Sequence, residues 1–389
     1  MAKEKKIITK ENWVSNFNLI GEAKVSDYTF KIDEKSTKSA WVYNSMNLGV
    51  DCGEKHGTVY AEMMGGYGEN QSNGIYAHGK KEDGADDFST QIIIDWDDRF
   101  NEDILDEIGD MCFITVGLET TDKGKTFYKK FLSQYDAINY IKEHLRDGMV
   151  VNVRGNLKYS TYNDVTQVRK NITSIVLSKV DDKSKYSARF TQSVLLDKYS
   201  ASLKNNDKNK GVIYIDAKVL DYIKEYNGIE VKGQYPFSKQ FEFAMDFSDE
   251  TKCKKIMEKL FKVKKDITQI NFEGELIEGG ATVMPTLDDI PQDIKDLIEL
   301  GIYTEEQALA RCATNGNREQ RMVLKSPVIR NTEDGDKVTS FVQRYEEKYT
   351  EEDLILDYLY ENDLNNDVVE NENVEISDTD DVDDWLSKL

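Results

Sequence analysis

The same succession of sequence patterns, predicting strands, then a helix, then further strands, occurs twice along this chain of 389 residues, and this repeat limits which folds the chain can adopt. Each round begins with short runs of alternating apolar and polar residues, continues with a segment whose apolar residues have helical spacing, and ends with further alternating runs. A phrase in which such a run meets a glycine recurs as VNVRGNL, IEVKGQY and INFEGEL. Because a glycine there relieves the sharp bend of a small barrel, the repeat predicts two copies of one barrel architecture.

The first round occupies residues 1–182. Its alternating runs are NLIGEAKV, SAWVYNSMNLGVDC, GTVYAEMMGG, TQIIIDW and MCFITVGL. The segment YDAINYIKEHL has Ile138, Ile141 and Leu145 at helical spacing and leads into two alternating runs that flank the turn pair Asn163 and Asp164. Strands, then a helix, then a hairpin predict a five-stranded barrel.

The second round occupies residues 183–330. The runs SARFTQSVLL, KGVIYIDAKVLDYI, GIEVKGQY and KQFEFAMDF precede a helical segment, DETKCKKIMEKLF, and the strand ITQINFEGELIEGG. A helical pair is predicted at 285–316, where Thr304 and Gln307 have the spacing of a capping box. A helix-turn-helix DNA reader is the alternative, but its second helix carries a single cation, Arg311, which favours an insertion before the last strand.

Residues 331–389 form an acidic tail. They contain 20 Asp or Glu and 4 Lys or Arg, a net charge of −16, so the first 330 residues carry −22 − (−16) = −6. The piece YTEEDLILDYLYEN predicts a short helix that packs on the body or on a partner, and the rest has too few apolar residues to offset chain entropy. The predicted fold class is therefore mainly β with α insertions: two OB-like five-stranded barrels followed by a largely disordered acidic tail.

The free end of the tail carries acidic residues followed by an apolar tip. We predict that it docks on partner proteins and competes with nucleic acid for a basic groove on the body. A solubilising appendage is the alternative. The predicted partner-binding residues are Asp383, Asp384, Trp385, Leu386 and Leu389.

The cysteines and histidines argue against a metal site and against secretion. The four cysteines lie far apart without a CxxC pair, and none of the three histidines has metal-ligand spacing from another His or Cys. No apolar run after the start MAKEKKIITK resembles a signal peptide or a membrane span. We therefore expect a cytoplasmic protein with reduced thiols, no metal and no cofactor.

Signals of catalysis are weak. The cluster Asp95, Asp97 and Asp98 ends an apolar strand, which is where two-metal nucleases often place acids, but a solvated strand end explains it in a chain with 73 acidic residues. The motifs GxxxxGK[ST], GxSxG and HExxH do not occur. We expect no enzymatic activity.

Residues of the types that bind nucleic acid are instead concentrated in the first round. By period two, Arg154, Lys158 and Tyr162 share one face of a predicted strand, a mixture suited to neutralising phosphates and stacking bases. For one hairpin alone, an ordinary solvated sheet face is the better explanation. The glycine-rich loop from residue 63 to 81 and the FYKKF segment add further aromatic and basic residues. The predicted main contacts are Arg154, Lys158, Tyr159, Tyr162, Arg169 and Lys170. The predicted secondary contacts are Tyr67, Tyr76, Lys80, Lys81, Tyr128, Lys129 and Lys130.

The chain resembles the single-stranded DNA-binding proteins of bacteriophage replication systems. The resemblance rests on FNLIGEAKV, MNLGVDCG with GTVYAEMMGG, DGMVVNVRGNLKYSTY and the acidic end DDVDDWLSKL, and it covers most of the chain. It implies OB barrels, no catalysis, single-stranded DNA as ligand, replication, recombination and repair proteins as partners of the tail, and a place in the bacterial host cytoplasm. The tail departs from the family pattern because Ser387, Lys388 and Leu389 follow Trp385 and Leu386.

Two other classes stay open. The isoelectric point is near 4.7, so the protein has a negative net charge at neutral pH, and this charge repels DNA. An acidic interaction module, or a decoy that imitates nucleic acid, would have such a charge. A metal nuclease that uses Asp95 and Asp97 ranks third.

Overall fold

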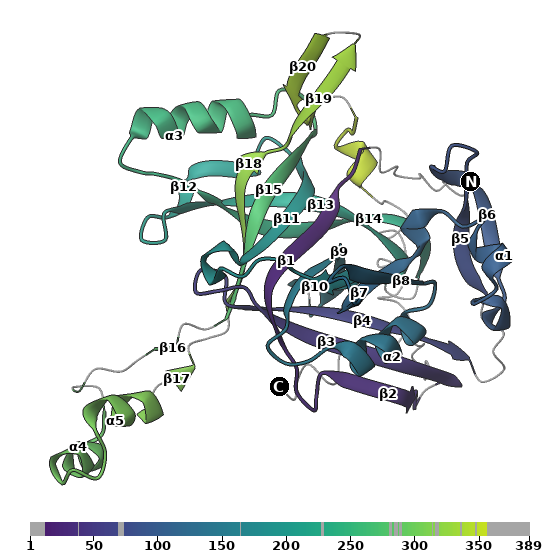
Figure 1. Ribbon diagram of the computed structural model, residues 1–389. Helices are drawn as coiled ribbons and strands as arrows, with labels where there is room; N and C mark the ends of the chain where they lie inside the picture. The colour runs from purple at the N-terminus through teal and green to yellow at the C-terminus, as the bar shows by residue number, and fades with distance from the viewer. Residues whose placement is uncertain are drawn as a thin grey trace, which may run out of the picture.

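The computed structural model describes residues 12–355 apart from 38, 69–73, 164, 227–228, 280–281, 284–286, 288–289, 313, 316–318, 335–336 and 347. Most strands belong to one sheet that rolls up twice, so that two barrels lie side by side (Figure 1). Strand β1 (Ser15–Lys24) joins them, because it pairs with β3 and β9 in the first barrel and with β11 in the second.

The first barrel closes in the order β1-β3-β4-β10-β9-β1. Its other strands are β3 (Trp41–Asp51), β4 (Thr58–Gly68), β9 (Val150–Tyr162) and β10 (Val165–Leu177). All neighbours are antiparallel except β4 and β10, which meet at Glu62 and Asn171. Helix α2 (Gln134–His144) lies between β4 and β9 in the chain and buries Ala137, Ile138 and Ile141 against the barrel.

The second barrel repeats this order as β11-β13-β14-β18-β15-β11. Its strands are β11 (Ser187–Leu196), β13 (Val212–Tyr226), β14 (Ile229–Ala244), β15 (Thr268–Gly279) and β18 (Glu319–Pro327). Again a single pair, β14 with β18, is parallel. Helix α3 (Glu250–Ile256) and the π-helical turn η4 (Met257–Phe261) occupy the place of α2. The predicted fold class is thus confirmed.

Two of the three repeated glycines occupy equivalent strands. A Cβ at Gly155 in β9 would lie 1.9 Å from the Asn171 carbonyl oxygen, and one at Gly274 in β15 would lie 2.3 Å from the Phe190 ring. Both strands therefore need glycine because a neighbour approaches closely at the bend. Gly233 belongs to β14, where a Cβ would meet ordinary van der Waals contacts, so the IEVKGQY phrase is not a third equivalent position.

The hydrophobic core runs through both barrels without a break. Leu19, Val153 and Phe190 belong to the same buried cluster as Phe241 and Phe272. Strand β1 contributes alternate residues to it, as its period-two burial pattern shows. The sheet that joins the barrels is therefore also the wall of a shared core.

The first barrel carries three additions (Figure 1). Strand β2 (Phe30–Lys35) pairs with β3, and the hairpin of β7 (Ile114–Thr120) and β8 (Thr126–Phe131) lies along β10. A separate arm consists of β5 (Ile75–Lys80) and β6 (Asp86–Ile94). The short elements η1 (Trp96–Asp98), α1 (Glu102–Leu105) and η2 (Asp110–Cys112) link the arm to β7.

The second barrel carries its own additions. The turn η3 (Lys183–Lys185) precedes it, and β12 (Ala201–Asp207) pairs with β13. Helices α4 (Gln292–Glu299) and α5 (Glu305–Cys312) lie with β16 (Thr282–Val283) and β17 (Thr314–Asn315) between β15 and β18, so the helical pair precedes the last strand of the barrel. The predicted capping box is present, because the Thr304 and Gln307 backbone N–H groups each donate to the other's side chain, over 3.2 Å.

The segment after residue 330 corrects the predicted start of the tail. Strands β19 (Ile329–Asp334) and β20 (Lys337–Val342) form a hairpin, β21 (Arg344–Tyr345) pairs with β15, and η5 (Glu352–Leu354) follows. Tyr349 and Leu354 are buried against Leu195 and Leu220, since apolar residues recur often enough here to fold onto the body. The predicted partner-binding residues lie outside the described residues.

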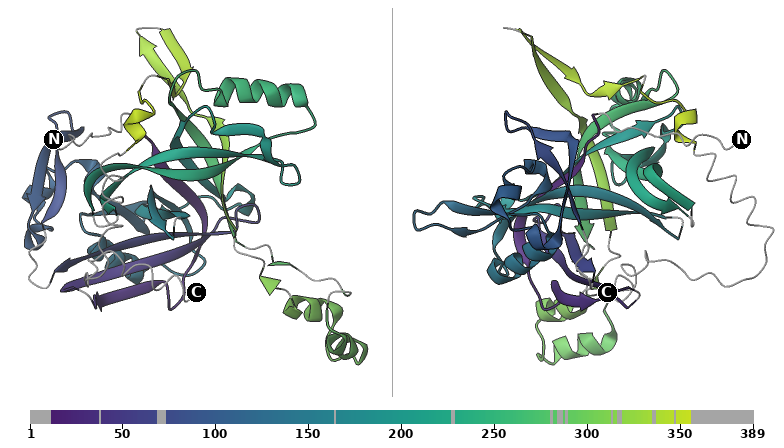
Figure 2. Two further views of the ribbon diagram at one scale, coloured as in Figure 1. Left: turned by 180° about the vertical axis from the view of Figure 1, so that it is seen from behind. Right: turned by 90° about the vertical axis from the view of Figure 1, so that its right-hand side faces the viewer.

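The hairpin β19–β20 and the pair α4–α5 project from opposite ends of the molecule (Figure 2). Within the described residues, no helix combines the length and the apolar character needed to cross a membrane. The two predicted strands GIEVKGQY and KQFEFAMDF belong to one continuous strand, β14, and the strands β2 and β12 were not predicted.

Candidate nucleic-acid interface

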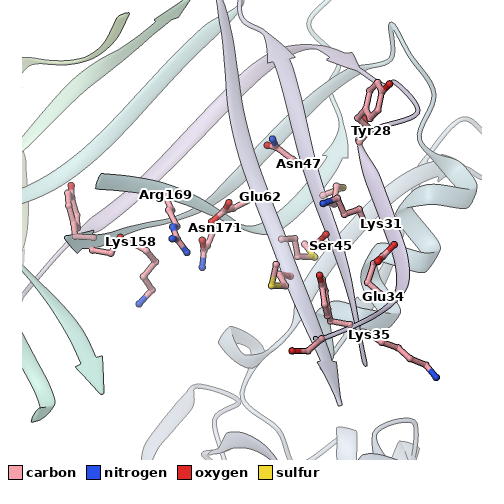
Figure 3. A pocket seen from close by; sticks show the side chains of 18 of the residues that line it. Tyr28, Lys31, Glu34, Lys35, Ser45, Asn47, Glu62, Lys158, Arg169 and Asn171 are labelled. Atoms are coloured by element: carbon pink, nitrogen blue, oxygen red, sulfur yellow. The ribbon is translucent and has the colours of Figure 1, made fainter. Parts of the chain in front are cut away.

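A cleft of about 740 Å³ crosses the outer face of the first barrel and ends against β13 of the second (Figure 3). Strands β2, β3, β4, β9 and β10 supply most of its lining, and β13 supplies Asp221 and Tyr222. The cleft therefore has walls from both barrels, which the shared sheet and core hold together.

Strand register explains why polar side chains gather in the cleft. Asn47 pairs with Glu62 across β3 and β4, and Glu62 pairs with Asn171 across β4 and β10. Paired residues on adjacent strands point to the same face, so these three form a polar row on the barrel surface. One step along the same face, Arg169 of β10 pairs with Lys158 of β9 (Figure 3).

The charges of the cleft nearly balance. Its cations are Lys31, Lys35, Lys158 and Arg169, and its carboxylates are Glu34, Glu62 and Asp221. The Lys158 ammonium lies 3.2 Å from a carboxylate oxygen of Asp221. Asp221 is buried and also accepts the backbone N–H groups of Tyr159 and Tyr222, each over 2.8 Å, so it is held in place as the partner of Lys158.

Tyrosine rings stand at both ends of the cleft. Tyr28, on the turn before β2, is 85% exposed, and Tyr222 of β13 is 49% exposed. Tyr43 also lines the cleft, on β3 opposite Glu34 of β2, and stacks on Trp41 with ring centroids 4.9 Å apart. Exposed rings beside cations can stack bases while the cations meet phosphates.

Sequence reasoning missed Tyr28, Lys31, Lys35, Tyr43 and Tyr222. The segment DYTFKIDEK alternates apolar and charged residues, a signal from which β2 and its lysines could have been predicted. Tyr222 gave no such signal, because its place in the cleft depends on how the two barrels pack.

Of the predicted main contacts, the structure brings Lys158 and Arg169 together in the cleft. Arg154 lies on the same outward face of β9, exposed, with its Nε 3.3 Å from the Asn152 side-chain oxygen. Tyr162 is 52% exposed at the end of β9. Neither Arg154 nor Tyr162 lines the cleft.

Lys170 does not line the cleft, and Tyr159 lines it with only 4% of its surface exposed. Both side chains are buried, because they belong to the alternate residues of their strands that point inward, where the two barrels meet. The Tyr159 hydroxyl donates to the Gln192 side-chain oxygen over 2.8 Å, and burial raises its pKa well above the ordinary value. The Lys170 ammonium lies 2.5 Å from a carboxylate oxygen of Glu278, so it neutralises a buried charge instead of a phosphate.

None of the seven predicted secondary contacts lines the cleft. Lys80 of the arm and Lys130 of β8 both approach one oxygen of Asp110, at 3.7 and 3.0 Å, which joins the arm to the β7–β8 hairpin. Tyr76 is 71% exposed and Lys81 is also exposed.

The remaining secondary contacts differ in exposure. Tyr128 is 59% exposed on β8, and the Lys129 ammonium lies 4.7 Å from the centre of the Tyr140 ring. Tyr67 packs between Trp96 and Tyr135, with centroids 5.1 and 5.4 Å away, so its ring serves the core more than a ligand.

The acidic cluster ends β6 and begins η1: Asp95 precedes the turn, and Trp96 inserts into the protein beside it. Across the described part of the chain, no group of three or more His, Cys, Asp or Glu side chains is arranged to hold a metal ion.

Comparisons with known proteins gave a family match and nine matching chains among solved structures, two of which are described below. A family model described as YorF matches residues 78–275, just over half of the chain. The single-stranded DNA binding protein from Thermus aquaticus is 9% identical, with a TM-score of 0.29, over 69% of this chain and 87% of that one. A deletion mutant of the same protein is 8% identical, with a TM-score of 0.31, over 68% and 87%. No curated protein matches the sequence.

Proposed function

This chain belongs to the YorF family, and because that name states no activity, we propose from the cleft that the protein binds single-stranded DNA. One observation carries the proposal: exposed tyrosine rings, cations and a row of amide and carboxylate groups share one cleft on the outer face of an OB-like barrel. Such a combination suits a strand whose bases are unpaired.

Each group has a separate part in binding. The rings of Tyr28 and Tyr222 stack bases, at about 1–3 kcal/mol for each base. Lys31, Lys35 and Arg169 meet phosphates, while the Asp221 carboxylate already offsets Lys158. Since the cleft contains nearly as many acids as cations, stacking contributes more to affinity than charge does. A duplex hides its base faces and therefore gains little from these rings.

In the proposal the protein coats single strands during phage replication or recombination and performs no chemistry on them. The acidic end of the chain, beyond residue 355, recruits replication and recombination proteins and competes with DNA for the cleft. This part rests on the sequence, which places 12 acidic residues and 1 basic residue in 356–389. A tethered polyanion competes at high effective concentration.

A fluorescence anisotropy titration at low salt tests the proposal. Labelled oligo(dT) and a duplex of equal length are titrated with the full chain, and the single strand is expected to bind at least about ten-fold more tightly. Absence of oligo(dT) binding would overturn the proposal and favour an acidic decoy, which would block another DNA-binding protein without retarding an oligonucleotide itself. Equal affinity for the duplex would also overturn it.

A further inference from the structure

Three reactive side chains from distant parts of the sequence meet at the foot of the β5–β6 arm. Cys112 ends η2, His78 belongs to β5, and Asp86 begins β6. The Cys112 sulfur lies 3.2 Å from Nδ1 of His78, and Nε2 of the same ring lies 2.6 Å from a carboxylate oxygen of Asp86. The cluster therefore has a nucleophile, a base and a group that orients the base.

Asp86 holds the ring in the orientation that a base needs. Its carboxylate accepts the Met111 backbone N–H over 3.0 Å and faces Nε2 of His78, and these two hydrogen bonds lower its pKa. An ionised carboxylate at Nε2 keeps the ring proton on that nitrogen. Nδ1, which is the ring nitrogen nearer to the sulfur, at 3.2 Å against 3.7 Å for Nε2, is then left as the acceptor for the thiol proton.

The sulfur is also prepared to carry negative charge. The His78 backbone N–H donates to the Cys112 sulfur over 3.3 Å, and a hydrogen bond to a thiolate stabilises the charged form. Charges on the neighbouring elements are already paired: Asp110 of η2 meets Lys80 and Lys130. The ring of His78 is therefore the group placed to take the proton from Cys112.

The surroundings leave this thiol accessible. Cys112 is partly exposed, and the flanking side chains Met111 and Phe88 are 73% and 71% exposed. The other two cysteines whose side chains are described, Cys52 and Cys253, are buried. Burial raises the pKa of the Cys52 thiol, and the Cys253 thiol donates to the Asp246 carbonyl over 3.1 Å.

We propose that Cys112 is a reactive thiol and a site of modification by low-molecular-weight disulfides. His78 takes the thiol proton, and the thiolate attacks one sulfur of the disulfide. A new bond forms between the Cys112 sulfur and that sulfur, the original S–S bond breaks, and the second sulfur leaves as a thiolate that takes the proton from His78. Cys112 is oxidised and the leaving sulfur is reduced, so the electrons balance.

The same geometry argues against two other uses of the cluster. The sulfur lies 3.2 Å from Nδ1 and 3.7 Å from Nε2 of His78, the Asp86 carboxylate lies 2.6 Å from Nε2, and within the described residues no three such side chains are arranged to hold one metal ion. Acyl transfer needs free backbone donors for an oxyanion, but the N–H groups of Cys112 and Phe113 already bond to the Gly109 and Asp110 carbonyls. Modification of the thiol requires neither.

The test measures how fast oxidised glutathione adds to each cysteine of the full chain at neutral pH, resolved by peptide mass spectrometry. In the folded chain Cys112 is expected to react roughly ten-fold faster than in the same chain unfolded in urea. A cysteine that is merely half-buried would react more slowly when folded. The comparison needs no variant and no nucleic acid, so it is independent of the proposed function.

Two variants separate the roles within the cluster. His78→Gln removes the base and Asp86→Asn removes the charge that orients it, and each is expected to slow Cys112 roughly ten-fold while circular dichroism stays unchanged. His144→Gln, which changes a partly exposed histidine at the end of α2, is the matched control and should leave the rate unaltered. Slower reaction in the folded wild type than in the unfolded chain, or an unchanged rate in His78→Gln, would overturn the proposal.

Discussion

The substitution Tyr28→Ala isolates the stacking contribution to DNA binding. Tyr28 is 85% exposed on the turn before β2, and its backbone N–H bond to the Ser26 hydroxyl oxygen does not depend on the ring. The free energy of unfolding should therefore change by no more than about 0.5 kcal/mol. Loss of one stacked base costs about 1–3 kcal/mol of binding free energy. That range corresponds to a dissociation constant for oligo(dT) raised about 5- to 150-fold.

The assay is a titration of labelled oligo(dT) at one low salt concentration, with urea unfolding of the same samples to compare stability. Tyr199→Ala is the matched control, because Tyr199 is 78% exposed on the second barrel and does not line the cleft. Its affinity should equal that of the wild type. The reasoning is refuted if Tyr28→Ala binds within about two-fold of the wild type, or if Tyr199→Ala loses as much affinity.

Four further predictions follow from the charges of the molecule. A plot of log affinity for oligo(dT) against log salt should have a slope of about −2, because three cations of the cleft, Lys31, Lys35 and Arg169, meet phosphates and each phosphate contact on a single strand contributes about −0.7; a slope steeper than about −5 would place the main contacts elsewhere. Lys170→Met should lower the free energy of unfolding by about 3–5 kcal/mol, since it leaves the Glu278 carboxylate buried and unpaired; urea unfolding measures this, and adding Glu278→Gln should restore part of the loss. Burial lowers the pKa of His56 below its ordinary 6.5, so the unfolded chain binds more protons below that pH, and stability should fall on acidification by up to about 1.4 kcal/mol per pH unit; this part of the slope should vanish in His56→Gln. Truncation after residue 355 removes 12 acidic residues and 1 basic residue and should tighten oligo(dT) binding at low salt; unchanged affinity would end the competition hypothesis but not partner docking.

The barrels could be predicted because local patterns determine them. Alternation, helical spacing and turn pairs occur in the same order twice, and the order of elements in each round matches the order of strands and helix in each barrel. The glycine phrase identified equivalent strands at Gly155 and Gly274, where close backbone or ring contacts exclude a side chain. The same phrase at Gly233 does not mark an equivalent strand, because a short alternating run that includes a glycine also occurs in a strand without such a close contact.

Part of the cleft could be predicted by period two alone. Lys158 and Arg169 share an outward face, as alternation along β9 and β10 requires. Tyr159 and Lys170, one residue further along each strand, point inward to the second barrel. A tyrosine and a lysine are residue types that often contact nucleic acid, which is why both were predicted. Whether a strand residue is exposed depends instead on its position in the alternation, because neighbouring residues point to opposite faces of the sheet.

The rest depends on tertiary structure. Tyr222 reaches the cleft because the barrels share β1 and a core, and no local pattern reports that arrangement. His78, Asp86 and Cys112 span 35 residues of sequence and meet because η2 packs at the foot of the arm. The beginning of the tail was missed for a similar reason, since Tyr349 and Leu354 fold onto apolar residues of the second barrel.

Photocrosslinking tests the central claim most directly. An oligo(dT) that carries 5-iododeoxyuridine is irradiated with the full chain, and the crosslinked peptides are mapped by mass spectrometry. The account predicts crosslinks at Tyr28, Tyr43 and Tyr222, on both barrels around one cleft. Crosslinks confined to the β5–β6 arm, to α4–α5 or to the outer side of the second barrel would contradict it.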